Sequence, residues 1–286
     1  MLGERRAKRD EHVVDGKRSG ERRQLRVLDE ALGGWARLFD NSRRVFKAPS
    51  GLSFPLRLGD KRITPSRGPG PQEIGMLTIH HLGVSQSERI VWLCEELDLK
   101  YELKRYERRA DNQLAPEDYK ALHPMGVAPV VTDGALVLAE SGAICDYINV
   151  RYGQGRLAPA PSDPDFAQHL FWFHWTNGTY GSAGFAGLAL ALAGKSSSDV
   201  PLVKDRLERS RAMIEQRLGE TPFFGGRNLS LADIMMVWSL TTARTFRGGR
   251  IDGLPNTLSY LERIGQRPAY RRAMAKAEPG MAPMLT

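Results

Sequence analysis

The chain has 286 residues, of which 41% are hydrophobic, with a formal net charge of +8 and two cysteines. This apolar content suffices for one large or two ordinary globular domains, and it excludes a chain that is disordered throughout. Residues 1–75 hold 17 basic and 10 acidic side chains, which leaves 24 basic and 23 acidic ones for the rest. No basic stripe for nucleic acid is therefore expected beyond residue 75.

Residues 1–75 combine basic clusters with a proline- and glycine-rich run over residues 64–71. This composition predicts a disordered basic extension. No stretch has the apolar core of a secretory signal or the length of a membrane span. Because an alternating strand begins at Met76, we expect that translation starts there. The alternative is a translated polybasic tail that contacts acidic surfaces or nucleic acid.

From Met76 the hydrophobic pattern switches repeatedly between the periods of strands and helices. A strand-helix-strand unit implies a parallel pair, and the Asp133-Gly134 turn implies an antiparallel hairpin, so we expect a mixed sheet. The predicted elements are strand 76–82, helix 87–98, strand 101–107, helix 116–122, strands 128–132 and 135–138, and helix 140–151.

The strand signals stop after a proline-rich linker, and the second half of the chain is expected to be all-helical. We assign residues 76–152 to the first domain, 153–163 to the linker and 164–286 to the helical domain. The predicted helices span residues 165–193, 201–219, 230–246, 256–265 and 268–276.

Cys94 and Cys145 each lie within an apolar helical pattern, and neither forms a CxxC or metal-ligand spacing. We expect both to be unreactive buried thiols in a reducing compartment, the cytoplasm. The six histidines show no metal-ligand spacing either, so no metal site is expected.

The segment from His123 to Ser141 places a proline at the entrance to a strand and an acidic-hydroxyl pair at the start of a helix. Proline cannot donate to a sheet ladder, so the backbone of Ala128, just before Pro129, could pair with an extended ligand. Glu140 and Ser141 could cap the helix, or could hold a ligand ammonium and carboxylate at its N-terminus. The residues alone leave these two interpretations open.

The loop before the first helix carries a second cluster of hydroxyls. Ser85 and Glu88 have the spacing of a capping box, which would serve only to start the helix. A hydroxyl at a helix N-terminus could also hydrogen-bond a bound thiolate and favour its ionised form. Ser87 competes with Ser85 for both roles.

These residues resemble the cytosolic glutathione transferases, specifically the serine-type bacterial and fungal members. The resemblance covers about residues 76–280 and implies a thioredoxin-like N-terminal domain with a mixed four-stranded sheet, an all-helical C-terminal domain, and a homodimer. The matching landmarks, in order, are Ser85–Arg89, the HPxGxxP stretch over residues 123–129, the Glu140-Ser141 helix start, and Leu229–Ile234.

The resemblance assigns roles to six residues. It implies that Ser85 contacts the glutathione sulfur and that Glu140 and Ser141 hold the γ-glutamyl end. It also implies that the backbone of Ala128 pairs with the cysteinyl unit, that Pro129 is a cis-proline, and that Val127 belongs to the same glutathione-binding stretch.

Val127 stands where many relatives carry Lys or Gln, which removes a side-chain contact to the glycyl carboxylate of glutathione. Arg108, Arg109 and Lys120 remain as candidates for that contact.

The resemblance therefore implies a detoxifying glutathione transferase, with glutathione as co-substrate and a small hydrophobic electrophile as second substrate. The alternatives are a non-catalytic glutathione- or protein-binding module, and a glutathione-dependent peroxidase, dehalogenase or isomerase. One or two of Trp172, Trp175, Asn177 and Tyr180 are expected to face the electrophile. Ser230 and Asp233 form a second capping box, which we assign to folding.

Overall fold

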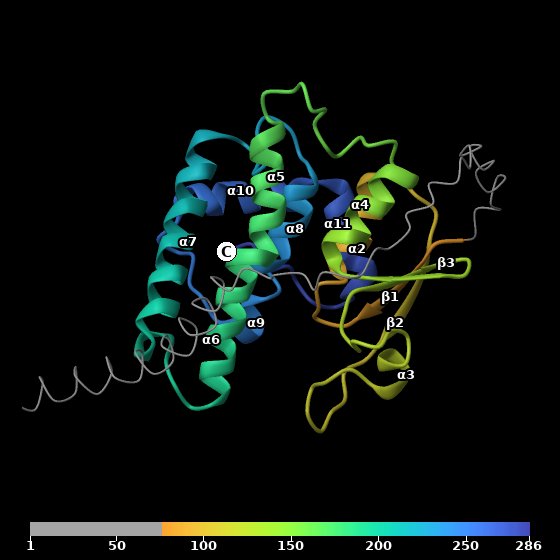
Figure 1. Cartoon of the computed structure of the whole chain (residues 1–286), viewed down its shortest axis with the longest axis horizontal. Coiled ribbons are helices and arrows are strands. Elements are labelled where there is room, and N and C mark those ends of the chain that lie inside the picture. Colours follow the sequence, from red (N-terminus) through yellow and green to blue (C-terminus); the bar gives the residue numbers. More distant parts are fainter. Residues whose placement is uncertain (1–75) are drawn as a thin grey trace, which may run out of the picture. The chain divides into compact units, whose positions relative to one another are not determined.

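The computed structural model describes residues 76–286. The predictions of a disordered basic extension over residues 1–75 and of a translation start at Met76 concern a segment outside the described residues. Strands occur only in the first part of the described chain (Figure 1). This part contains β1 (Thr78–Leu82), α2 (Glu88–Glu96), β2 (Glu102–Tyr106), α3 (Glu117–Lys120), β3 (Val130–Asp133), β4 (Leu136–Ala139) and α4 (Ser141–Arg151).

The four strands form one mixed sheet in the order β2-β1-β3-β4. β1 pairs in parallel with β2, so the connection between them must cross over through α2. β1 pairs antiparallel with β3, and β3 with β4. The tight β3–β4 turn places Gly134 at a φ of +57°, a region that favours glycine. The sheet and its helices confirm the predicted thioredoxin-like first half.

The rest of the described chain is helical except for one isolated bridge, and none of its helices combines the length and hydropathy that crossing a membrane requires. The elements are α5 (Phe166–Trp175), η2 (Thr176–Gly181), α6 (Ser182–Leu192), η3 (Ser197–Asp199), α7 (Pro201–Glu220), α8 (Leu231–Leu240), α9 (Arg244–Arg247), α10 (Pro255–Gln266) and α11 (Pro268–Ala277).

Two predicted helices are interrupted. The helix expected over residues 165–193 contains the π-helical turn η2, which includes two glycines. The helix expected over 230–246 ends at Leu240, because Thr241 has φ −120° and ψ −101°. A short helix, α9, then follows. Periodicity alone does not reveal these breaks, and no proline marks either segment.

Both halves of the described chain share one hydrophobic core. Every residue of α8 is buried, which explains why this helix has no polar face. α8 packs against α2 and α5, and α11 packs against α2, where the rings of Trp92 and Tyr270 lie 5.2 Å apart. The loop between β1 and α2 is thereby held between the sheet and the helical part.

The predicted capping box at the start of α8 is confirmed. The Ser230 hydroxyl accepts the Ala232 N–H at 3.3 Å, and the Asp233 carboxylate accepts the Ser230 N–H at 2.9 Å. Asp233 also accepts from the Phe224 N–H and the Tyr260 hydroxyl. Burial raises the pKa of Asp233 to about 6.

Candidate functional site

The loop between β1 and α2 is fixed from both sides. Val84 has a φ of +52°, which is unusual for a β-branched residue. The Arg108 guanidinium donates to the carbonyl oxygens of Gly83 at 2.8 Å and Val84 at 3.1 Å. The Glu278 carboxylate, just after α11, accepts the Val84 N–H at 2.6 Å. Such a strained residue persists only where its surroundings hold it, and here they hold the entrance to Ser85.

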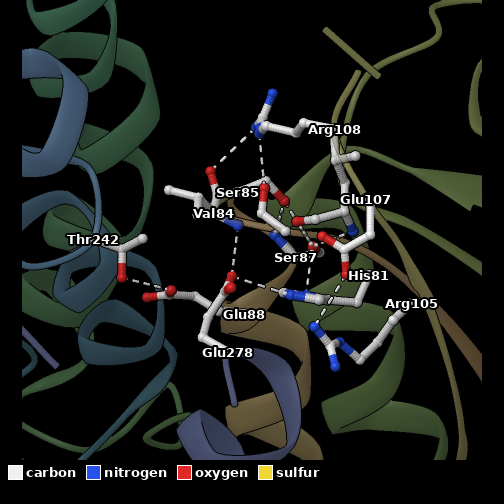
Figure 2. A network of polar contacts seen from close by, with 12 residues as sticks. His81, Val84, Ser85, Ser87, Glu88, Arg105, Glu107, Arg108, Thr242 and Glu278 are labelled. Carbon is white, nitrogen blue, oxygen red and sulfur yellow. Dashed lines mark hydrogen bonds and ion pairs between the residues drawn. The ribbon is translucent and has the colours of Figure 1, made fainter. Parts of the chain in front are cut away.

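Ser85 is the first member of a buried hydrogen-bonded chain (Figure 2). Its Oγ lies 2.7 Å from Ser87 Oγ and accepts the Ser87 N–H at 3.2 Å. Ser87 Oγ lies 2.9 Å from His81 Nδ1, and His81 Nε2 lies 3.1 Å from Glu278 Oε1. The chain therefore links the two serines to a carboxylate about 190 residues later in the sequence.

The capping box predicted between Ser85 and Glu88 is wrong. α2 begins at Glu88 with Ser87 as the backbone N-cap, and no side chain caps the helix. The Ser87 hydroxyl instead contacts His81 and the backbone of Leu82, while Glu88 accepts from the Thr242 hydroxyl at 2.7 Å. Tertiary partners thus compete successfully with the local cap.

Glu88 matters for the electrostatics of the loop. Burial raises the pKa of this carboxyl to about 8, so near neutral pH it is largely uncharged. A charged glutamate in the first turn would cancel part of the positive potential at a helix N-terminus, and the neutral acid does not. The start of α2 therefore stays favourable for an anion.

The proline-containing segment lies where β3 begins. The Ala128–Pro129 bond is cis. The ladder between β1 and β3 ends at the His80–Val130 pair, so Ala128 lies beyond the last paired residue. Val127 is exposed, with 48% of its surface accessible. The backbone of Val127 and Ala128 is thus placed outside the sheet ladder, as an extended ligand requires.

Glu140 does not act as a helix cap. It occupies the N-cap position of α4 with a φ of +71°, its side chain makes no capping hydrogen bond, and it is exposed. A non-glycine residue in this region is strained. Ser141 is buried, and its hydroxyl accepts from Arg89 Nη1 at 3.0 Å and from Asn177 Nδ2 at 2.9 Å.

Arg89 joins the two halves of the site. Its guanidinium donates to Gln86, to Ser141, to Asn177 Oδ1 at 3.1 Å and to Ser239 Oγ at 3.2 Å. It is 2% exposed, and burial lowers its pKa to about 9. Only the planar fork of an arginine reaches so many acceptors at once.

The three candidates for the glycyl carboxylate differ in what they already bind. Arg108 is committed to the carbonyls that hold the loop, and also donates to Gln113 O at 2.8 Å. Arg109 pairs with Asp111 at 2.7 Å. Lys120 pairs with Glu117 at 2.8 Å, and its stem packs beside Gly126 of the HPxGxxP stretch. Lys120 thus lies nearest in structure to that stretch.

The residues expected to face the electrophile lie in three different surroundings. Trp172 and Trp175 are buried in the core. Asn177 belongs to the polar cluster at Ser141. Tyr180 stacks on Trp175 with ring centroids 5.5 Å apart and lines a cavity in the helical part.

Cys94 and Cys145 are free and completely buried, as predicted. Burial raises the pKa of both thiols, that of Cys145 to about 12. Within residues 76–286, no group of three or more His, Cys, Asp or Glu is placed to hold a metal ion.

Fold and site together define a two-domain protein in which a thioredoxin-like sheet carries the serine loop and a helical domain anchors it. Residues 77–150 match the family model described as glutathione S-transferase, N-terminal domain, and residues 181–268 match the corresponding C-terminal domain. A crystal structure of a glutathione S-transferase from Actinobacillus pleuropneumoniae is 33% identical, with a TM-score of 0.65, and aligns with 71% of this chain and 93% of its own. The chain belongs to the glutathione S-transferase family.

Other relatives carry names that denote different activities. Glutathione S-transferase 3 of Schizosaccharomyces pombe is 28% identical, over 71% of this chain and 88% of its own length. The disulfide-bond oxidoreductase YfcG of Escherichia coli is 26% identical, over 72% of this chain and 97% of its own length. Membership of the glutathione S-transferase family therefore does not by itself specify the reaction, because these two relatives are named for different reactions.

The sequence did not point to His81 or Glu278. The sequence did contain a signal for His81. Residues two apart in a strand share one face of the sheet, so His81 lies on the same face as the buried Ile79. No signal existed for Glu278, because only the packing of α11 on α2 brings it to the loop.

Proposed function

We propose that this protein is a glutathione transferase of the cytoplasm, which promotes attack of the glutathione thiolate on a hydrophobic electrophile. The observation that carries the proposal is the buried pair of hydroxyls, Ser85 and Ser87, at the positive end of α2. Glutathione would lie along the backbone of Val127, Ala128 and Pro129, with its γ-glutamyl end at Glu140 and Ser141.

One hydrogen bond from a serine hydroxyl can supply the free energy needed to ionise the glutathione thiol near pH 7. A free thiol with a pKa near 8.5 is mostly protonated at pH 7, and lowering the pKa by about two units requires about 2.7 kcal/mol. One hydrogen bond from a hydroxyl to a charged group supplies about 1.5–3 kcal/mol. We assign this bond to Ser85, because Ser87 is already engaged by His81 and the Leu82 backbone.

The test compares Ser85→Ala with Ser87→Ala, using Ser259→Ala on the exposed side of α10 as a matched control. Turnover of an aryl halide and the absorbance of the bound thiolate are measured against pH. We expect Ser85→Ala to lower turnover at least tenfold with a small loss of glutathione affinity, and the control to be unchanged. If only Ser87→Ala lowers turnover, Ser85 is not the sulfur contact.

A second candidate function is glutathione-dependent thiol-disulfide or peroxide chemistry, which the relationship to the oxidoreductase YfcG favours. Both cysteines are buried, so two glutathione molecules would have to supply the reacting thiols. Peroxide consumption coupled to glutathione oxidation, without turnover of electrophiles, would support this function. Retention on immobilised glutathione with neither reaction would support a binding module.

We also infer a homodimer. Leu170 and Phe171 on α5 are 39% and 44% exposed, and they line an open apolar groove with Trp175. Grouped exposed apolar side chains on a soluble protein commonly mark an interface. Sedimentation of the purified protein tests this inference.

A further inference from the structure

A cavity of about 370 Å³ lies in the helical part, between α6, α7, α8, α9 and the loop before α10. Its size suits a small organic molecule. Leu188, Leu207, Ile214 and Leu254 provide an apolar wall. The cavity is also lined by five cationic side chains and, within the described chain, by no acidic one. The cationic residues are Lys195, Arg211, Arg244, Arg247 and Arg250.

Most of this positive charge is not neutralised by carboxylates of residues 76–286. Arg250 pairs with Asp252, whereas Arg244 donates to the oxygens of Gly249, Met284 and, at 2.7 Å, the last residue Thr286. Arg247 lies over the Trp238 ring, and its buried Nε has no hydrogen-bond partner among the described residues. A buried cationic donor without a partner is costly, and an anion in the cavity would remove that cost.

The cavity adjoins the proposed glutathione site. Ser239 lines the cavity, and its hydroxyl accepts from Arg89, which also donates to Ser141. Tyr180 lines the cavity from η2, the same helical turn that carries Asn177. The buried Arg89 thus links a residue of the cavity wall to a residue of the proposed glutathione site.

We propose that this cavity binds the second substrate, and that this substrate is an organic anion. Its carboxylate or sulfonate would lie among Arg211, Arg244 and Arg247, and its apolar body against Leu188 and Leu207. This inference rests on the proposed transferase function and names a substrate class for it. An arginine fork pairs with a planar carboxylate in a way that a neutral electrophile cannot match.

The experiment uses two electrophiles of similar size, the anionic 4-chloro-3-nitrobenzoate and the neutral 4-chloro-3-nitrobenzamide, and each enzymatic rate is divided by the uncatalysed rate with glutathione. In both, the glutathione thiolate forms a carbon-sulfur bond at the carbon that bears chlorine, and chloride leaves. We expect a kcat/KM about tenfold or more higher for the benzoate than for the benzamide. Arg247→Met and Arg211→Met should abolish that preference, whereas Arg206→Met, exposed on α7, should retain it. Equal use of both electrophiles by the native protein would overturn the proposal.

A binding measurement separates this proposal from the transferase function. The fluorescent aryl sulfonate 8-anilinonaphthalene-1-sulfonate is titrated without glutathione, with the uncharged N-phenyl-1-naphthylamine as its counterpart. Binding of the sulfonate alone, weakened by Arg211→Met and not by Arg206→Met, supports the anion site even if no electrophile is turned over. Equal binding of both dyes, or competition by inorganic phosphate as strong as by benzoate, would contradict an organic-anion site.

A different observation, the chain from Ser85 to Glu278, carries a second inference (Figure 2). A carboxylate only accepts hydrogen bonds, so His81 Nε2 donates to Glu278, and Nδ1 of the neutral ring is left as an acceptor. Ser87 then donates to His81 Nδ1, and Ser85 donates to Ser87. In this arrangement the Ser85 oxygen is free to accept a thiol proton.

The same four groups have a second, reversed arrangement. When His81 is doubly protonated, Nδ1 donates to Ser87, Ser87 donates to Ser85, and Ser85 donates outward to a thiolate. We propose that glutathione binding drives this reversal. The thiol proton passes to Ser85, the Ser85 proton to Ser87, and the Ser87 proton to His81 Nδ1.

Charge is conserved in this transfer, because the products are a thiolate and an imidazolium whose charge Glu278 balances. His81 is then the proton acceptor and Glu278 a positioning residue. The other titratable or charged groups around the chain are the largely uncharged Glu88 in α2, Arg105 and Glu107 in and after β2, and Arg108 on the loop carbonyls. This inference also rests on the proposed transferase function.

The distinguishing measurement is the number of protons released when glutathione binds, obtained by calorimetry in buffers of different ionisation enthalpy. We expect that the native protein forms thiolate but releases almost no proton, because His81 retains it. His81→Asn, which keeps a polar atom near Nδ1 but cannot take up the proton, should release about one proton for each thiolate formed. S-methylglutathione, which has no thiol proton, is the control ligand.

The outcomes distinguish failure of the proposed proton transfer to His81 from failure of the proposed transferase function. If the native protein does not bind glutathione, the proposed function fails. If it binds glutathione as thiolate but releases one proton, only the proposed proton transfer to His81 is wrong. The same holds if His81→Asn and Glu278→Gln leave the pH dependence of thiolate formation unchanged.

Discussion

Replacing Glu88 by Gln should change how the stability of the protein depends on pH. Glu88 is 3% exposed and accepts a hydrogen bond from Thr242 at 2.7 Å, and burial raises its pKa to about 8. A glutamine keeps the shape and accepts the same hydrogen bond, but it has no proton to lose.

The sign and size follow from proton linkage. The native state holds the Glu88 proton more tightly than the unfolded chain, where the pKa is about 4.5. The stabilisation is therefore complete below pH 4.5, and it is lost as the pH rises through about 8. At 1.36 kcal/mol for each pH unit over this interval, the loss is on the order of 5 kcal/mol.

The assay is urea unfolding at several values between pH 5 and pH 9. We expect the free energy of unfolding of the native protein to fall over this range by several kcal/mol more than that of Glu88→Gln. Glu262→Gln, at an exposed position of α10, should behave like the native protein. Parallel curves for native protein and Glu88→Gln would show that Glu88 is ionised in the folded state and that the reasoning is wrong.

Three further predictions concern folding and assembly. Ser230→Ala removes a capping hydroxyl and should lower the free energy of unfolding by about 1–2 kcal/mol; a change under about 0.3 kcal/mol would contradict the role of the cap. Arg89→Met leaves the buried Ser239 hydroxyl without its donor and removes one of the two donors to Ser141, so urea unfolding should show a loss of about 3 kcal/mol or more, whereas a loss near zero would mean that water replaces the arginine. Phe171→Glu places a charge in the apolar groove of α5 and should convert a dimer to a monomer in sedimentation, whereas an unchanged dimer would exclude this face as the interface.

The sequence predicted the layout of the described chain closely, because hydrophobic periodicity reports directly which side of an element is buried. The mixed sheet, its hairpin at Asp133-Gly134 and the helical second half all follow from local patterns. The breaks at η2 and after α8 did not, since no proline marks either one.

The hydrogen-bond partners of residues at the candidate site were harder to predict from the sequence than the layout of the fold. The local pattern at Ser85 and Glu88 indicated a capping box, but in the structure the Glu88 carboxyl accepts a hydrogen bond from Thr242 in the helical domain. Arg108 looked like a free cation for a ligand carboxylate, but it holds the carbonyls of the serine loop. In each case a partner distant in the sequence offered a buried hydrogen bond, which is worth more than an exposed local one.

The elements of the sheet, the cap of α8 and the buried cysteines could be predicted from the sequence, which also led to the serine loop as the proposed place for chemistry. These features depend on neighbouring residues, so a linear pattern records them. Three features follow from tertiary packing alone. His81 and Glu278 continue the hydrogen-bonded chain of the serines, Arg89 joins both halves of the site, and arginines of α7 and α9 line one cavity. Those groups meet because α8 and α11 pack on α2, and no local pattern encodes which side chains such packing brings together.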